Sequence, residues 1–364
     1  MKLEDLNRDS QNLLIVSAIL LCIGIIMIYS ASSCYAYEQY NDSAYYLKRH
    51  LMHFTFGLLL AGFFLKKGYK DLKKYAKVFL AVSIVGLVLA LLPGIGREAG
   101  GAKRWVKLGF IGFQPSEFAG FFLIVYIADI LDRKQTVIRS FLQGFMPPLM
   151  ILGLSVLLIL LQPDLGSSVC IMAVGLIMMF VSGVKMVYFL PFLIMVIPIF
   201  YFLIFKVAYR LRRIASYLDP WSDSQGAGFQ IIQSFLALGS GGILGLGLGC
   251  SKQKLFYLPQ AHTDFIFSII GEETGIIGTL SVVALFVIFV WLGMRISIKA
   301  KDLFGRFLSL GITTSIGLKA IINIAVSTGA IPTKGPPLPF IGYGGTALIF
   351  NIIAVAVLIN ISNS

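Results

Sequence analysis

The sequence is poor in charge, and above all in acidic charge. Charged residues make up 13% of its 364 positions, and 17 aspartates and glutamates stand against 30 lysines and arginines. Hydrophobic residues make up 57%, which is more apolar surface than the core of a soluble domain needs. The composition therefore excludes an ordinary soluble domain and predicts a protein that crosses a membrane many times.

Cysteine is also sparse. The four cysteines, Cys22, Cys34, Cys170 and Cys250, are scattered, and none has the CxxC or Cys/His spacing of a metal site. We therefore expect neither a disulfide framework nor a metal site built on cysteine. In so apolar a chain the net charge of +13 indicates contact with anionic lipid, and an anionic substrate, rather than nucleic acid.

Apolar runs of spanning length predict an all-α polytopic fold of about ten transmembrane helices, in a single integral membrane domain over residues 1–364. No cleavable signal is evident, because the first apolar run is long enough to span. The second run is short, so we expect it to be tilted or extended by its flanks. The predicted spans are residues 13–33, 51–65, 76–92, 116–131, 142–161, 166–183, 186–206, 264–294, 307–327 and 345–362.

Lysine and arginine in short loops set the expected orientation. They concentrate in segments 66–77, 132–140 and 295–306, which fall on one side of the membrane if there are ten spans. That side is predicted to be cytoplasmic, and both termini lie there. The other side carries two longer loops, at about 93–115 and about 207–263, the second between the seventh and eighth spans.

These two outer loops carry basic residues against the general bias. One interpretation is ordinary loop solvation, and the other is a surface that binds an anion such as pyrophosphate. The residues are Arg97, Lys103, Arg104, Lys107, Arg210, Arg212, Arg213, Lys252 and Lys254.

The glycine-dense run 239–249 has two interpretations as well. Glycine lets backbone N–H groups approach a phosphate. The run lacks the Lys-Ser/Thr ending of a Walker A motif, however, so close packing of a loop or helix is the favoured interpretation.

Five polar motifs lie at predicted outward loops or helix ends. An active site for a headgroup at the outer face requires that they converge there. They are Lys103–Gly109 with Gln114–Glu117, Gln162–Gly166, Arg212–Trp221 with Gly228–Ser234, Leu258–Gly275, and Pro332–Gly345.

The fourth motif is the most informative, because it places His262, Thr263 and Asp264 where a loop meets an apolar helix. A carboxylate at membrane depth is costly and is kept mainly where it faces a cavity or a partner. At the mouth of a cavity Asp264 can act as a general base on a polar headgroup. The alternative is that Asp264 only caps the helix that it begins. Glu272 and Glu273 point to other faces of that helix, so we expect them to serve packing or hydrogen bonding.

Together the five motifs resemble the SEDS family, the lipid II polymerases FtsW, RodA and SpoVE, over nearly the whole chain. The forms GFQIIQS and QKLFYLPQAHTDFIF are more similar to FtsW and SpoVE than to RodA. The resemblance implies a ten-helix fold in the bacterial cytoplasmic membrane and glycan-strand polymerisation from lipid II at its outer face. It also implies a class B penicillin-binding protein as partner, within a division, elongation or sporulation complex.

The resemblance also implies roles for individual residues. Asp264 matches the essential acid, which would deprotonate a hydroxyl of the acceptor sugar. A divalent cation, Mg²⁺ or Mn²⁺, or nearby basic residues would stabilise the pyrophosphate leaving group, although the sequence shows no ligand set. Substrate binding is assigned to Arg104, Glu117, Asp164, His262, Thr263, Lys319 and Lys334.

Three of these assignments have a structural alternative. Glu117 follows Pro115 in the Gln-Pro-Ser-Glu motif and would favour a helix N-terminus. Asp164 would stabilise the turn of its Pro-Asp-Leu-Gly motif. Arg104 would extend to the membrane interface beside Trp105.

The chain departs from the family pattern at two positions that we expect to compensate. Gly120 stands where a lysine is common, three residues after the motif glutamate, and Lys319 stands where glutamine is usual. A lysine within the membrane needs a partner, so we expect Lys319 to pair with Glu117 or Asp164. The alternative is that Lys319 lies near a helix end and extends to water. Gly342 and Thr346 also replace serines that are common in the family.

Two further functions stay open. A flippase for lipid-linked precursors would need a polar path across the membrane, whereas the motifs gather near the outer side. A non-catalytic scaffold that recruits a penicillin-binding protein is consistent with the loss of the lysine at Gly120.

Overall fold

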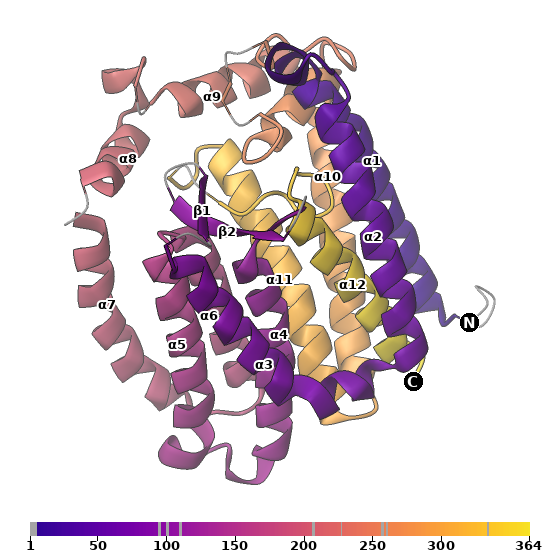
Figure 1. The fold of residues 1–364 in the computed structure, drawn as a ribbon, viewed down its shortest axis with the longest axis vertical. Helices are drawn as coiled ribbons and strands as arrows, with labels where there is room; N and C mark the ends of the chain where they lie inside the picture. The colour runs from indigo at the N-terminus through magenta and orange to yellow at the C-terminus, as the bar shows by residue number, and fades with distance from the viewer. Residues whose placement is uncertain are drawn as a thin grey trace.

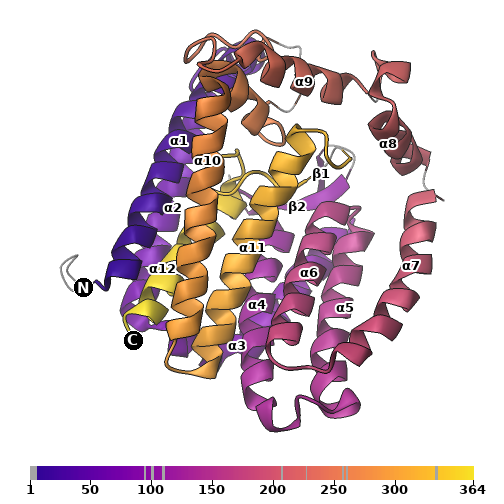
Figure 2. The same ribbon diagram turned by 180° about the vertical axis from the view of Figure 1, so that it is seen from behind.

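The computed structural model describes residues 6–93, 96–99, 102–108, 111–205, 208–226, 228–255, 258–259, 261–332 and 335–364. Most of the long helices lie side by side in one bundle, one long helix stands apart beside it, and a short helix lies across one end (Figures 1 and 2). Each of the ten predicted spans falls on one long helix. These helices are α1 (Arg8–Tyr40), α2 (Tyr45–Lys67), α3 (Tyr69–Leu91), α4 (Pro115–Arg133), α5 (Met146–Leu161), α6 (Leu165–Val181), α7 (Phe189–Phe205), α10 (Ile266–Lys299), α11 (Leu303–Ser327) and α12 (Gly345–Ser362). Of these, α7 is the one that stands apart.

The helices fit a multi-pass membrane protein. Among the described residues, six helices are both long and apolar enough to cross a bilayer. The second span is extended by its flanks as expected, since α2 has 23 residues. α12 is buried along nearly its whole length, and it packs against α2 through the stripe of His50, His53, Gly57 and Ala61.

The two chain termini and the basic segments lie at one end of the bundle, which we call the terminal end. The backbone N–H of Asn7 donates to Asn363 Oδ1 at 2.9 Å, and Lys299 Nζ lies 2.6 Å from Asp9 Oδ2. Lys73 of segment 66–77 pairs with Asp132 of segment 132–140 at 2.5 Å. The three basic segments therefore share one end with the termini, as the ten-span pattern predicts.

The opposite end, the site end, holds more regular structure than the expected loops. Segment 93–115 contains a three-stranded antiparallel sheet in the order β1 (Gly96–Ala99), β2 (Ala102–Leu108) and β3 (Ile111–Phe113). Segment 207–263 contains α8 (Ala208–Leu218), which lies beside the bundle next to α7, and α9 (Phe229–Gly241), which crosses the end of the bundle (Figure 1). The remaining elements are the short helices η2 (Gln135–Val137), η3 (Phe141–Phe145), η4 (Met186–Tyr188) and η5 (Pro220–Asp223).

α10 is broken at Gly275, where φ is 68° and ψ is −164°, a conformation open essentially only to glycine. The segment that follows α9 closes this break with its own backbone. The N–H groups of Leu246 and Gly247 donate to the carbonyls of Glu272 and Glu273, at 2.9 and 3.0 Å. On the far side of the break, the N–H of Ile276 donates to the carbonyl of Gly242 at 3.0 Å.

The glycine-dense run 239–249 is therefore a packing element, which confirms the favoured interpretation. A Cβ atom on residue 241 would lie 2.0 Å from the carbonyl oxygen of Gly271, and one on residue 245 would lie 2.2 Å from that of Glu273. Only glycine permits the run to approach α10 so closely.

We predict that Gly275→Ala destabilises the protein. The new side chain would lie 2.4 Å from the carbonyl oxygen of Ile243, and the left-handed φ alone costs roughly 1–3 kcal/mol. Thermal unfolding of the detergent-purified protein measures the loss. Gly62→Ala in α2 is the control, because its Cβ would meet no atom within 4 Å. Equal melting temperatures for the two variants would contradict the role of the break.

Candidate active site

A cavity of about 750 Å³ lies at the site end, and all five motifs contribute to its walls. This confirms that the motifs converge. The volume is within the range of cavities that hold organic ligands. The lining residues from the motifs include Trp105, Gln114, Glu117, Asp164, Arg213, Gln230, His262, Thr263, Asp264, Pro336, Tyr343 and Gly344.

Asp264 lies in the turn that leads into α10 and lines this cavity. The helix begins at Ile266, and Phe265 occupies the N-cap position. The alternative that Asp264 is the cap of this helix is therefore wrong, because the turn continues for one more residue before the helix begins. Its half-buried side chain belongs to the cavity wall.

Asn323 of α11 fixes the backbone of this turn. Its Nδ2 donates to the carbonyl oxygen of Asp264 at 3.1 Å and to that of Pro336 at 3.1 Å. One amide group thus joins the fourth motif to the fifth. Ser327 Oγ also lies 3.5 Å from the carbonyl oxygen of Asp264.

His262 and Thr263 line the same cavity. The carbonyl of His262 accepts a hydrogen bond from the N–H of Tyr343 at 2.9 Å, and its ring centroid lies 4.6 Å from that of Tyr46. Burial lowers the pKa of His262 to about 4, so the imidazole is neutral at neutral pH. His262 therefore offers an aromatic face and a polar nitrogen, and it does not supply a positive charge to a pyrophosphate.

Lys319 of α11 pairs with Glu117 of α4, as expected from the sequence. Its Nζ lies 2.6 Å from Glu117 Oε2, and the two side chains are 16% and 5% exposed. The alternative that Lys319 extends to water is therefore wrong. Glu117 lines both the large cavity and a smaller one of about 40 Å³ beneath it, which Gly120 and Lys319 also line. The ion pair thus lies between the two cavities.

Asp164 combines its two proposed roles. It is the N-cap of α6, where Oδ1 accepts from the N–H of Ser167 at 3.3 Å and Oδ2 accepts from the hydroxyl of Ser167 at 3.0 Å. It also lines the large cavity. Glu117 likewise lies in the first turn of α4, which Pro115 begins.

The remaining basic candidates are only partly described. Arg104 lies in β2, where the pairing with β1 shifts register, and its side chain is outside the described part of the structure. Lys334 lies outside the described residues. Arg213 and Lys254 line the cavity. A surface that binds pyrophosphate therefore stays a prediction.

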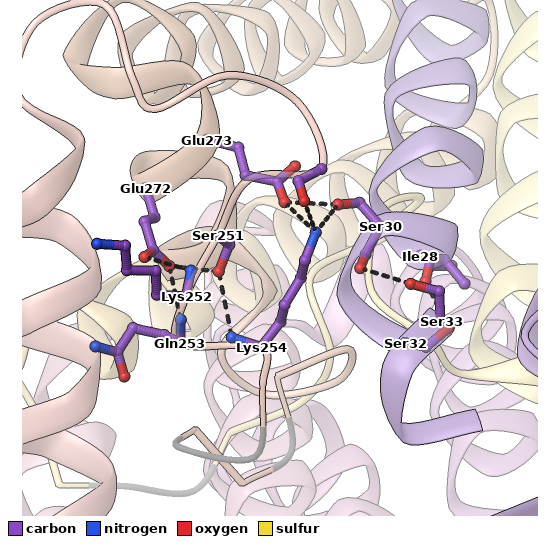
Figure 3. A network of polar contacts seen from close by, with 11 residues as sticks. Ile28, Ser30, Ser32, Ser33, Ser251, Lys252, Gln253, Lys254, Glu272 and Glu273 are labelled. Atoms are coloured by element: carbon purple, nitrogen blue, oxygen red, sulfur yellow. Dashed lines mark hydrogen bonds and ion pairs between the residues drawn. The ribbon is translucent and has the colours of Figure 1, made fainter. Parts of the chain in front are cut away.

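Glu272 and Glu273 form a buried network with the loop after the glycine run (Figure 3). Glu272 Oε1 accepts from the N–H of Lys252 at 2.9 Å, and Oε2 accepts from the hydroxyl of Ser251. Glu273 Oε1 accepts from Lys254 Nζ at 2.9 Å and from Ser30 Oγ of α1 at 2.6 Å. The expected hydrogen-bonding role is confirmed, and the network fixes the segment that precedes the Asp264 turn.

Some cavity residues were not predicted. Tyr35 and Tyr46, which lie outside the five motifs, line the cavity, and Asn323 holds its two loops. The signals available were five tyrosines within residues 35–46 and an asparagine within an apolar run. Both patterns are also typical of membrane-interface anchors or helix packing.

The described residues contain no group of three or more His, Cys, Asp or Glu side chains that could hold a metal ion. A divalent cation at the cavity therefore stays a prediction.

A model of the FtsW/RodA/SpoVE family, described as "Cell cycle protein", matches residues 10–364. The chain belongs to this family. It is 45% identical over 349 residues to the probable peptidoglycan glycosyltransferase FtsW of Geobacter sp. (strain M18), covering 96% of this chain and 95% of the relative. It is 41% identical over 350 residues to stage V sporulation protein E of Bacillus subtilis (strain 168), covering 96% of each.

Solved structures show the same fold. A chain of a peptidoglycan synthase complex that coordinates polymerization and crosslinking aligns with a TM-score of 0.80, at 26% identity over 96% of each chain. The rod shape determining protein RodA of Thermus thermophilus aligns with a TM-score of 0.71, at 24% identity over 96% of this chain and 95% of that one. The helical fold inferred from the family resemblance is therefore confirmed.

We predict that Lys319→Gln lowers the melting temperature and that adding Gly120→Lys restores it. Removing one partner of a buried pair costs roughly 3–5 kcal/mol, and the partial exposure of Lys319 favours the lower value. A lysine at position 120 would lie one helical turn from Glu117, beside the same small cavity.

The control is Lys48→Gln, which removes an exposed pair with Asp42 and should change little, since Lys48 is 69% exposed. The compensation hypothesis is wrong if the double variant melts no higher than Lys319→Gln alone.

Proposed function

We propose that this chain is a peptidoglycan glycosyltransferase that polymerises lipid II into glycan strands at the outer face of the bacterial cytoplasmic membrane. The observation that carries the proposal is the position of Asp264 in a cavity that all five motifs line. The cavity lies at the end of the bundle opposite the termini and the basic segments. Relatives of full length bear the name of this activity.

The reaction needs one proton transfer and one exchange of bonds. A hydroxyl oxygen of the acceptor sugar attacks the anomeric carbon of the donor while Asp264 accepts the hydroxyl proton. The bond from that carbon to the pyrophosphate oxygen breaks, and undecaprenyl pyrophosphate leaves with the electron pair. Asp264 thus acts as a general base, and the bonds of Asn323 and Ser327 to its carbonyl hold it in position.

The basic residues of the cavity differ in the acidic partners that they contact. Lys319 is neutralised by Glu117 and Lys254 by Glu273, so both serve mainly to hold the walls of the cavity. Arg213 of α8 also lines the cavity, and in this proposal it contributes to stabilising the charge that develops on the pyrophosphate.

The geometry favours chemistry over lipid translocation. A flippase would need polar groups along the length of the bundle. Beneath the large cavity, the smaller one measures only about 40 Å³, far below the volume that an organic headgroup needs, and Ile124, Ile171 and Ile312 are among the residues that line it. The class B penicillin-binding protein, and the division, elongation or sporulation complex in which it acts, remain part of this proposal on the strength of the family resemblance.

We predict that Asp264→Ala and Asp264→Asn abolish glycan-strand formation from purified lipid II, measured with the partner protein present. Loss of a general base costs about 10²–10⁴ in rate. Asp42→Ala is the matched control, because Asp42 lies in the α1–α2 loop at the site end and pairs with Lys48. Strand formation by Asp264→Ala at the wild-type rate would exclude Asp264 as the base, and its absence in the wild type would favour the scaffold.

We predict that the site end faces outward and that the termini are cytoplasmic. Single cysteines are introduced at Ser224 or Lys70, both exposed, in a variant without the four native cysteines. In intact cells a membrane-impermeant thiol reagent should label position 224, in the α8–α9 connection, and not position 70. The reverse labelling would overturn the proposed orientation.

A further inference from the structure

Four aromatic side chains from distant parts of the sequence meet at one wall of the large cavity. They are Tyr35 at the end of α1, Tyr46 at the start of α2, His262 in the Asp264 turn and Tyr343 before α12, and we call them the aromatic wall. The His262 ring centroid lies 4.6 Å from that of Tyr46, 5.7 Å from that of Tyr343 and 5.9 Å from that of Tyr35. Tyr46 and Tyr343 meet edge to face at 5.0 Å.

The wall differs from the tyrosine belt of a membrane interface. Tyrosines near helix ends commonly anchor a protein at the lipid headgroups. Tyr37 fits that role, since it is 62% exposed and is not among the residues that line the cavity. The four residues of the wall all line the cavity, and Tyr35 is 39% exposed overall. Packing thus leaves aromatic surface available inside the cavity.

The wall is uncharged at neutral pH. Burial lowers the pKa of His262 and raises that of Tyr343, so both rings are neutral. The rings of the wall thus carry no charge of their own to pair with a pyrophosphate. A cationic ligand is disfavoured, because Arg49 acts on Tyr343 and lies over the neighbouring Tyr45 ring at 4.5 Å, and Arg213 lines the same cavity.

A sugar ring fits such a wall. The face of an aromatic ring is electron-rich, and the C–H bonds on one face of a pyranose are weakly positive, so the two surfaces attract when stacked. Tyrosine hydroxyls and the imidazole nitrogens can exchange hydrogen bonds with sugar hydroxyls. Tyrosine is also rigid, so little side-chain entropy is lost on binding.

The wall is joined to the candidate base. His262 is two residues from Asp264, and the N–H of Tyr343 donates to the carbonyl of His262 at 2.9 Å. We propose that Tyr35, Tyr46, Tyr343 and His262 form a saccharide subsite that stacks one sugar ring of the lipid-linked substrate beside Asp264. This inference rests on the proposed function, and it specifies that the wall contacts a sugar ring of the substrate.

Binding of a soluble sugar tests the subsite apart from catalysis. The probe is the N-acetylglucosaminyl-N-acetylmuramyl pentapeptide, which has neither lipid nor pyrophosphate. Saturation-transfer NMR is used to titrate it against the full-length protein in detergent. We expect Tyr46→Ala and Tyr343→Ala to weaken binding about 2- to 10-fold each, as for the loss of one aromatic contact. Tyr46→Phe, which keeps the ring, should bind nearly as the wild type does.

A control variant tests for non-specific effects on binding, and a second wall variant replaces one that fails to fold. Tyr37→Ala lies on the same helix as Tyr35 but outside the cavity lining, so it should bind as the wild type does. If Tyr46→Ala fails to fold, judged by its melting temperature, Tyr35→Ala replaces it, because the exposed ring of Tyr35 packs less tightly.

The outcomes also separate this inference from the proposed function. Equal binding by wild type and the wall variants, together with wild-type strand formation, overturns the subsite and leaves the polymerase intact. Binding that depends on the wall, without strand formation by the wild type, supports the subsite and overturns the polymerase. No binding of the probe to the wild type overturns the subsite outright.

Discussion

The site end depends on how the break in α10 is closed. In hydrocarbon an unpaired backbone N–H or carbonyl costs several kcal/mol, so a helix that stops at Gly275 must find partners for its free groups. The segment after α9 supplies them from Gly242, Leu246 and Gly247. A connection between two helices thereby becomes part of the bundle, and the path of the chain toward Asp264 is set.

Two buried ion pairs fix the relative positions of the helices around the cavity and contribute little net stability. Glu273 with Lys254 ties the loop to α10 and α1, and Glu117 with Lys319 ties α4 to α11. The Coulomb attraction in such pairs is largely offset by the loss of hydration. A wrong arrangement, however, would leave a charge alone in an apolar setting, which is far more costly. The pairs therefore select one arrangement of the walls around the cavity.

Much of this could be predicted from the sequence, because the relevant signals are local. Apolar runs marked the spans, and the basic segments marked a common end. A lysine in a membrane helix predicted an acidic partner, and Glu117 is that partner. The three short strands within 96–113 carry too few residues for a clear alternation, so this segment was expected to be a loop. The helix that follows Asp264 begins later than expected, because Phe265 takes the cap position.

The contact of Tyr35 and Tyr46 with His262 and Tyr343, and the hydrogen bonds of Asn323, were not predicted, for a different reason. Tyr35 and Tyr343 lie some three hundred positions apart in the chain, and nothing local to either shows that they share a cavity. The same holds for Asn323, whose partners are two carbonyl groups that any residue would provide. Contacts of this kind follow from the packing of the helices and are visible only once the bundle is assembled.

α11 gives the cavity a fixed depth. Lys319, Asn323 and Ser327 are spaced four residues apart, so they follow one another up a single face of one helix. The first meets Glu117 between the two cavities, and the other two hold the backbone of Asp264. Each step of four residues rises about 6 Å along the helix axis. α11 therefore sets the height of the Asp264 backbone above Lys319, and a shift of α11 along its axis would strain its contacts with Asp264 and with Glu117 of α4 at the same time.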